Sequence, residues 1–286
     1  MYFDCYLEKN CIFAVPESPG GGMVDTLVSG TSASNGVQVR LLSWAQKREM
    51  SNHLFFFRTL LTSCTFPFSY ICRMRKYFLE SCCTSLEEVR RACLMGASRI
   101  ELCEKIDLGG VTPSISLTEK VLEVSTVPVN VMIRPRGGNF VYTREELEEM
   151  AAQIKAFKSL ISNGKFVNGF VFGALTPDRQ VDTSATRFLV NVSKENATPQ
   201  ITFHRAFDDV ADPQKALEDI IALGCTHLLT SGNREDAFKG RFNIAKLVAQ
   251  AAGRITIIAG KGIRKSNMEL IAEDSKAPQL HGTNLF

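Results

Sequence analysis

The sequence lacks the features that would point to a charged or membrane-bound partner. It has no block of like charges, and its 33 basic and 30 acidic residues leave a formal net charge of only +3. Nucleic-acid binding rests on concentrated positive charge, so we expect no nucleic-acid partner. There is no Cys-x-x-Cys pair and no convincing signal peptide, and the cysteines number nine, an odd count. We therefore expect reduced thiols and no disulfide framework.

Residues 1–74 lack any sustained helical or strand periodicity. Their apolar run Leu54–Cys72 has nearly the length of a membrane span, which needs roughly 20 apolar residues. Arg58 and Pro67 interrupt this run, so we predict no membrane segment. Two other interpretations stay open: a disordered extension, or an upstream start codon with the natural protein beginning at Met74. The second is favoured, and we assign no chemistry to residues 1–74.

Residues 75–286 show short apolar runs alternating with longer amphipathic ones. This alternation is typical of parallel strands joined by crossover helices. The expected strands are Tyr77–Cys82, Arg99–Cys103, Val127–Arg134, Gly169–Gly173, Gln200–His204, His227–Thr230, Ile255–Ala259 and Gln279–Gly282. Eight strands predict a (β/α)8 TIM-like barrel, with a doubly wound sheet as the rival.

The expected helices carry recognisable start signals. Ser85 with Glu88 reads as a capping box, and the Asp212-Pro213 pair places proline at a first helical position. The expected helices are Ser85–Met95, Thr143–Ile161, Asp182–Val192, one beginning at Asp212, Phe242–Ala252 and Lys265–Asp274. Only residues 283–286 follow the last strand. Either the sequence is truncated there or the barrel lacks its last helix, and we expect an exposed outer wall at strands one and eight.

Two cysteines and two glutamates end the first two expected strands. Glu80 and Cys82 share one face of the first strand, and Glu101 and Cys103 share one face of the second. If these neighbouring strands pair in register, the thiols approach each other above both carboxylates. Two soft sulfurs at that distance suit Cu(I). The alternative is that both cysteines pack as small hydrophobic residues.

Basic and titratable side chains end the other expected strands, on the face where parallel α/β folds place their sites. The anion-binding candidates are Arg134, Arg136, Arg205, Gly260 and Gly262, with the first two arginines sharing a face. The candidates for acid/base chemistry are Glu101, His204 and Asp208. This set predicts an enzyme site for a small anionic metabolite, phosphorylated ones included. A purely structural Glu–Arg ion network is the alternative.

At these strand ends the sequence resembles the CutC copper-homeostasis family. The resemblance spans about Arg75 to Thr283. It rests on Leu79-Glu80-Ser81-Cys82, Arg99-Ile100-Glu101-Leu102-Cys103, Met132-Ile133-Arg134-Pro135-Arg136-Gly137-Gly138-Asn139-Phe140, Phe203-His204-Arg205-Ala206-Phe207-Asp208 and Thr230-Ser231-Gly232. It implies a TIM-like barrel, a cytoplasmic location, a homodimer and copper ligands at Cys82 and Cys103. The chain departs from the family at Lys261, where a glycine is usual.

Overall fold

The computed structural model describes residues 77–283 and 285 and forms a closed barrel of parallel strands. Going around the barrel, the order is β1-β10-β9-β8-β7-β6-β3-β2, so the first and last strands of the chain close it. The strands are β1 Phe78–Cys83, β2 Arg99–Leu102, β3 Val129–Met132, β6 Gly169–Phe172, β7 Gln200–Phe203, β8 His227–Thr230, β9 Thr256–Gly260 and β10 Gln279–Gly282. The prediction of a (β/α)8 barrel is confirmed, and the doubly wound alternative is wrong.

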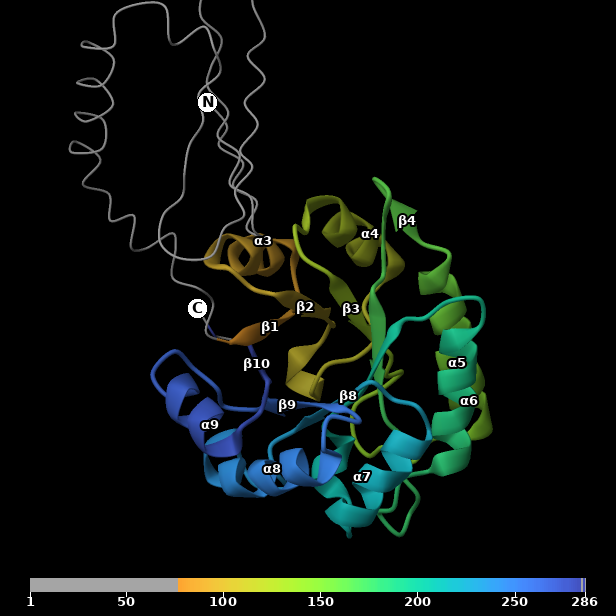
Figure 1. Ribbon diagram of the computed structural model, residues 1–286. Helices are drawn as coiled ribbons and strands as arrows, with labels where there is room; N and C mark the ends of the chain where they lie inside the picture. The colour runs from red at the N-terminus through yellow and green to blue at the C-terminus, as the bar shows by residue number, and fades with distance from the viewer. Residues whose placement is uncertain (1–76, 284, 286) are drawn as a thin grey trace, which may run out of the picture. The chain divides into compact units, whose positions relative to one another are not determined.

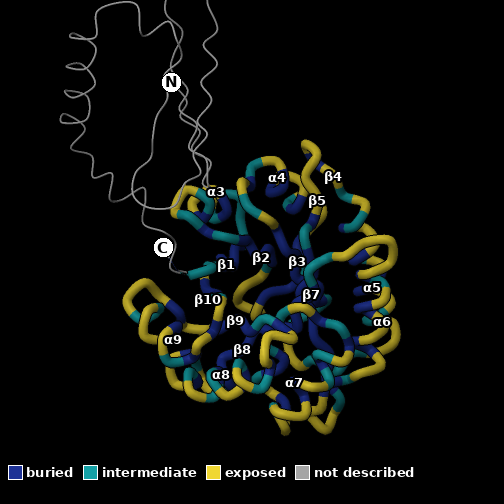
Figure 2. Tube along the Cα trace, in the orientation of Figure 1, coloured by how far each residue is buried: buried dark blue, intermediate teal, exposed yellow. Residues whose placement is uncertain are grey.

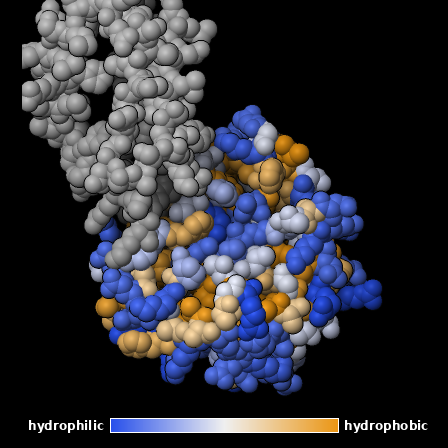
Figure 3. Space-filling view, in the orientation of Figure 1, coloured by the Kyte–Doolittle hydropathy of each residue, from blue (hydrophilic) through white to orange (hydrophobic). Residues whose placement is uncertain are grey.

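Helices surround the strands as an outer ring (Figure 1). They are α3 Leu86–Met95, α4 Ile115–Val124, α5 Arg144–Lys158, α6 Thr183–Lys194, α7 Pro213–Ala222, α8 Ala237–Ala251 and α9 Met268–Ser275, with the 3-10 helices η1 Ile106–Leu108 and η2 Arg205–Asp209. Figure 2 shows the strands buried and the outer helix surfaces exposed. On the face seen in Figure 3, hydrophilic and hydrophobic side chains are interspersed.

The helix starts follow from side-chain caps. Thr143 and Glu146 form a complete capping box at α5, and Asp212 caps α7 ahead of its proline. The box predicted at α3 forms only in part. Ser85 accepts the backbone N–H of Glu88, but the Glu88 carboxylate accepts from the backbone and hydroxyl of Thr84.

Two elements were not predicted, and one helix begins earlier than expected. The helix α4 lies between β2 and β3, where we expected none. A hairpin of β4 (Ile161–Ser162) and β5 (Lys165–Phe166) replaces the expected last residues of α5. The helix α8 begins at Ala237, behind the cap Asp236, instead of at Phe242.

The hydrophobic core lies mainly between the barrel and its helices. The outer wall of β1 and β10 belongs to it: Cys83 is 1% exposed and Leu280 is fully buried. Leu285, beyond β10, and Val89 and Ala92 of α3 are buried in the same cluster. The expectation of an exposed wall was therefore wrong. No helix among the described residues is long and apolar enough to span a membrane, and the Leu54–Cys72 run lies outside them.

Candidate functional site

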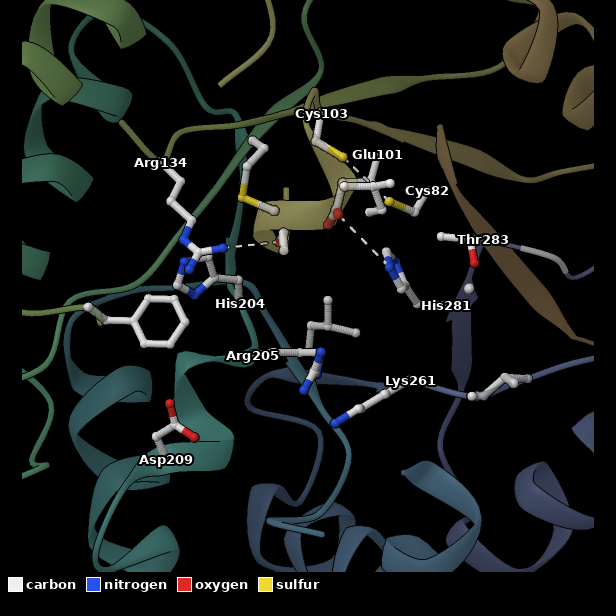
Figure 4. A pocket seen from close by; sticks show the side chains of 18 of the residues that line it. Cys82, Glu101, Cys103, Arg134, His204, Arg205, Asp209, Lys261, His281 and Thr283 are labelled. Carbon is white, nitrogen blue, oxygen red and sulfur yellow. Dashed lines mark hydrogen bonds and ion pairs between the residues drawn. The ribbon is translucent and has the colours of Figure 1, made fainter. Parts of the chain in front are cut away.

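A cavity of about 520 Å³ opens at the carboxyl ends of the strands (Figure 4). This is the end at which (β/α)8 enzymes place their sites. Its walls combine sulfur, carboxylate, imidazole, cationic and apolar groups. The residues lining it are Cys82, Glu101, Cys103, Ile106, Gly109, Met132, Arg134, Phe140, His204, Arg205, Asp209, Leu229, Lys261, Gly262, Ile263, Arg264, His281, Gly282 and Thr283.

The two predicted thiols meet at one end of this cavity. Cys82 lies near the end of β1 and Cys103 directly follows β2, and their Sγ atoms are 3.6 Å apart. The strand register pairs Cys82 with Glu101, so the thiols approach diagonally and not as direct cross-strand partners. The hydrogen bond with Cys103 and then burial raise the pKa of Cys82 well above its ordinary value. Its thiol is therefore protonated near neutral pH.

Glu80 lies deeper in the barrel and is fully buried. Its register partners on either side are Arg99 of β2 and His281 of β10, and it forms ion pairs with both. Burial by itself raises the pKa of a carboxyl group. Here the positive charge of Arg99 and the His281 hydrogen bond outweigh burial and lower the Glu80 pKa to about 2. Glu80 is thus a permanent anion that orients its two neighbours.

His281 connects this ion pair to the thiols. Its Nδ1 lies 2.8 Å from Glu80 Oε1, and its Nε2 lies 3.8 Å from Glu101 Oε1. A carboxylate at Nδ1 holds the Nδ1–H tautomer and directs Nε2 outward, the arrangement found behind metal-binding histidines. Ligand atoms of Cys82, Glu101 and His281 all lie within 4.8 Å of one another.

Glu101 completes this group of potential ligands. It is 2% exposed, and its Oε2 has no hydrogen-bond partner within the described part of the chain. Burial raises its pKa to about 7, because it outweighs the opposing charge of His281. An orphaned carboxylate oxygen beside two sulfurs and a directed imidazole nitrogen is a donor set that a metal ion can satisfy.

The two predicted arginines separate in the structure. Arg134 lines the cavity, where its guanidinium donates to the carbonyls of Leu108, Gly109, Gly110 and Gly138. Arg136 lies outside the cavity lining and pairs with Glu146 of α5. The prediction of a shared face was wrong because β3 ends at Met132, before the strand alternation can reach either arginine.

The candidates that follow β7 have different surroundings. His204 lines the cavity and is 4% exposed, and burial and then Arg134 lower its pKa to about 3. Arg205 also lines the cavity, and it pairs with Asp208. Asp208 lies outside the lining and accepts hydrogen bonds from Thr230 and the backbone of Ser231. Its contacts fix the loop after β8.

The two candidate glycines lie on either side of Lys261. Gly262 lines the cavity, whereas Gly260 does not; a side chain at Gly260 would begin 2.5 Å from Leu229 Cδ1. The predicted site set did not include His281, Lys261 or Arg264, although all three line the cavity. Their position at the ends of the last two strands was the signal available in the sequence.

Comparison with known proteins assigns this barrel to a family. A model of the CutC family matches residues 77–285. The chain belongs to the CutC family. A CutC protein of Vibrio cholerae is 41% identical over 206 residues, 72% of this chain and 79% of the relative. One from Parabacteroides distasonis is 42% identical over 208 residues, 72% of this chain and 82% of the relative.

A solved structure with the same fold comes from Streptococcus agalactiae and carries the name copper homeostasis protein CutC. It superposes with a TM-score of 0.67 at 33% identity, over 73% of this chain and 100% of its own. The resemblance to the CutC family is therefore confirmed. The cytoplasmic location, the homodimer and the division of the chain at residue 74 stay predictions.

Proposed function

We propose that this CutC-family protein binds Cu(I) at the Cys82–Cys103 end of its cavity and serves copper homeostasis. The observation that carries the proposal is the 3.6 Å separation of the two Sγ atoms, of which the Cys82 sulfur also lies beside Glu101 and His281. Thiolates are the soft ligands that Cu(I) prefers. The copper-homeostasis name of the Streptococcus agalactiae structure supports the same cargo.

A nitrogen and an oxygen donor stand beside Cys82. Ligand atoms of His281 and Glu101 lie within 4.8 Å of each other and of the Cys82 sulfur. We therefore propose His281 Nε2 as the third ligand, with Glu101 as the nearest carboxylate.

Anaerobic titration of Cu(I) against a competing chelator tests this proposal. The full chain is used with Cys5, Cys11, Cys64 and Cys72 replaced by serine, because these four cysteines lie outside the described residues and thiols in general are ligands that Cu(I) prefers. We expect one tightly bound ion, lost in Cys82→Ser with Cys103→Ser. The matched control is Cys83→Ser with Cys225→Ser, which removes two buried thiols that do not line the cavity.

Unchanged Cu(I) binding in Cys82→Ser with Cys103→Ser would refute the proposal. His281→Gln is expected to weaken binding by about 10-fold or more, because it removes a proposed ligand and loss of a ligand's hydrogen-bond partner alone costs about 10- to 100-fold. A parallel titration with Zn(II) identifies the cargo, because the same donor set is able to hold a four-coordinate Zn(II). Zn(II) binding without competitive Cu(I) binding would contradict the copper assignment.

A further inference from the structure

The cavity is far larger than a metal ion requires. Its volume is about 520 Å³, whereas one water molecule accounts for roughly 30 Å³ of liquid. The thiol and imidazole ligands occupy one end of it (Figure 4). A volume of this size is typical of pockets for small organic molecules.

Positive charge dominates the lining away from the thiols. Arg134, Arg205, Lys261 and Arg264 all line the cavity, against the single carboxylate of Asp209 at that end. Arg205 pairs with Asp208. Within the described residues, no ion pair is found for the side chains of Lys261 and Arg264. In Figure 4 the ends of the Arg205 and Lys261 side chains point toward one another.

Arg134 brings a buried charge without a carboxylate partner. Its side chain is mostly enclosed, at 6% exposure, and its hydrogen bonds go to backbone carbonyls only. Its buried Nε atom has no hydrogen-bond partner among the described residues. The carbonyls and the Phe140 ring, whose centroid is 4.8 Å from the guanidinium carbon, supply no full negative charge, so an anion in the cavity would stabilise this buried cation further.

His204 adds an unused donor to the same wall. Its Nδ1 accepts the backbone N–H of Ala206 at 3.2 Å, which leaves the ring proton on Nε2. Nε2 is buried, and none of the residues that the structure describes forms a hydrogen bond with it. The ring is neutral because burial and then Arg134 lower its pKa to about 3. A neutral N–H beside a cation is suited to hold an anionic or carbonyl oxygen.

Lys261 has an unfavourable backbone conformation for a residue with a side chain. Its φ is +76°, a region that favours glycine, and a non-glycine residue there stores on the order of 1 kcal/mol of strain. Strain of this kind concentrates at ligand-binding positions, where a side chain is kept despite the backbone. Here the retained side chain delivers an ammonium group to the cavity.

From these observations we propose that the cavity binds a small organic anion, a phosphate ester or a carboxylate, between Lys261, Arg264 and His204. The anion lies beside the metal ligands and not on them, so this site goes beyond the proposed copper function and does not depend on it. The apolar walls of Phe140 and Ile263 cover the body of the ligand.

Calorimetric titration of the full, reduced, metal-free chain tests the proposal. The probes are glycerol 3-phosphate and glycerate, with neutral glycerol as the control ligand, all at matched ionic strength. We expect one anion to bind and glycerol not to bind, and the two arms separate phosphate from carboxylate recognition. Absence of binding for both anions at about 10 mM, beyond the range of a millimolar site, would overturn the proposal.

Charge removal at exposed positions keeps the test independent of folding. Lys261→Ala with Arg264→Ala is expected to weaken anion binding about tenfold or more, as for loss of charge-assisted hydrogen bonds. Lys265→Ala with Lys120→Ala removes the same charge from exposed positions outside the lining and should leave binding unchanged. Equal weakening of anion binding in both double variants would show that binding depends only on the overall positive charge, and it would overturn the proposed site.

A third variant separates this site from the copper site. Cys82→Ser with Cys103→Ser should bind the anion with unchanged affinity while losing Cu(I). Loss of anion binding in that variant would overturn the placement of the ligand on the cationic end. Failure of Cu(I) binding with retained anion binding would leave this proposal standing and refute only the copper function.

Discussion

Replacing Glu80 by glutamine would test how the ion pairs deep in the barrel support the site. The substitution keeps the shape of the side chain but removes its charge from between Arg99 and His281. Both partners are largely buried, since Arg99 is 3% exposed and His281 is 7% exposed. Water therefore cannot easily take the place of the lost carboxylate beside either of them. Breaking a buried ion pair by removing one partner costs about 3–5 kcal/mol.

The same substitution should also weaken metal binding. Without the carboxylate at Nδ1, His281 loses the group that sets its tautomer and directs Nε2 toward Glu101. Loss of such a supporting carboxylate reduces metal affinity by about 10- to 100-fold. Glu80→Gln should therefore lower both the free energy of unfolding and the Cu(I) affinity.

Urea unfolding followed by circular dichroism, together with the Cu(I) competition titration, measures both effects. Glu218→Gln is the matched control, because it breaks an ion pair with Arg254 in which each of the two side chains is 46% exposed. Exposed pairs contribute little, so the control should lose much less stability. If Glu80→Gln costs no more than Glu218→Gln, the stabilising role of the pair is refuted. If stability falls but Cu(I) affinity does not, the role of Glu80 in orienting His281 for metal binding is refuted.

Acid should reveal the same pair in the unmodified protein. The Glu80 pKa is depressed from 4.5 to about 2, so its stabilisation is complete above pH 4.5 and is lost as the pH falls toward 2. In Glu80→Gln, this part of the acid dependence should be missing from urea midpoints measured across that range. An identical acid dependence in both proteins would contradict the depressed pKa.

Three further predictions follow from the contacts. The pKa of Cys82 is raised, and its thiol must lose a proton to bind metal. The Cu(I) affinity should therefore rise with pH between 6 and 8. A pH-independent affinity would contradict thiolate ligation. Arg136→Ala should leave Cu(I) affinity unchanged in the chelator titration, since Arg136 pairs with Glu146 outside the cavity. Gly240→Ala should destabilise the barrel by about 2 kcal/mol or more through overpacking, because an added Cβ would lie 1.8 Å from Ser231 O. Urea unfolding measures this loss of stability. An unchanged unfolding midpoint would contradict the prediction and show that α8 can shift to make room.

Much of the fold could be predicted because each strand is short, apolar and followed by polar residues. The elements that were missed have physical causes. The helix α4 is rich in β-branched residues, including Thr118, Val121 and Val124, which favour helices weakly. The helix α8 contains Gly240, which is unfavourable within a helix but is required by the close contact with Ser231.

The β4–β5 hairpin was missed although its signal is present. Asn163 and Gly164 connect the two short strands, with φ of +49° and +72°. An Asn-Gly pair with both residues at positive φ is the preferred two-residue hairpin turn. The amphipathic pattern of α5 continues to Ile161, and this continuity concealed the turn in the sequence.

The candidate site could be predicted only where its residues are close in the sequence or end neighbouring strands. Cys82 and Cys103 end consecutive strands, so alternation and the pairing of these two strands predicted that the thiols meet, although the register places them diagonally. His281 lies 201 residues after Glu80, and no local pattern relates the two. They become direct cross-strand partners only when β10 pairs with β1 to close the barrel.

The strand pairing that closes the barrel therefore also brings the residues of the site together. The register between β1 and β10 sets His281 against Glu80, and the register between β1 and β2 sets Glu80 against Arg99 and Cys82 against Glu101. A shift of one residue in either register would turn these side chains to the opposite face of the sheet. The buried charge of Glu80 penalises such a shift, because the observed register supplies both of its partners, the Arg99 guanidinium and the His281 imidazole. The ion pair that specifies how the barrel closes also orients the imidazole that faces the thiols.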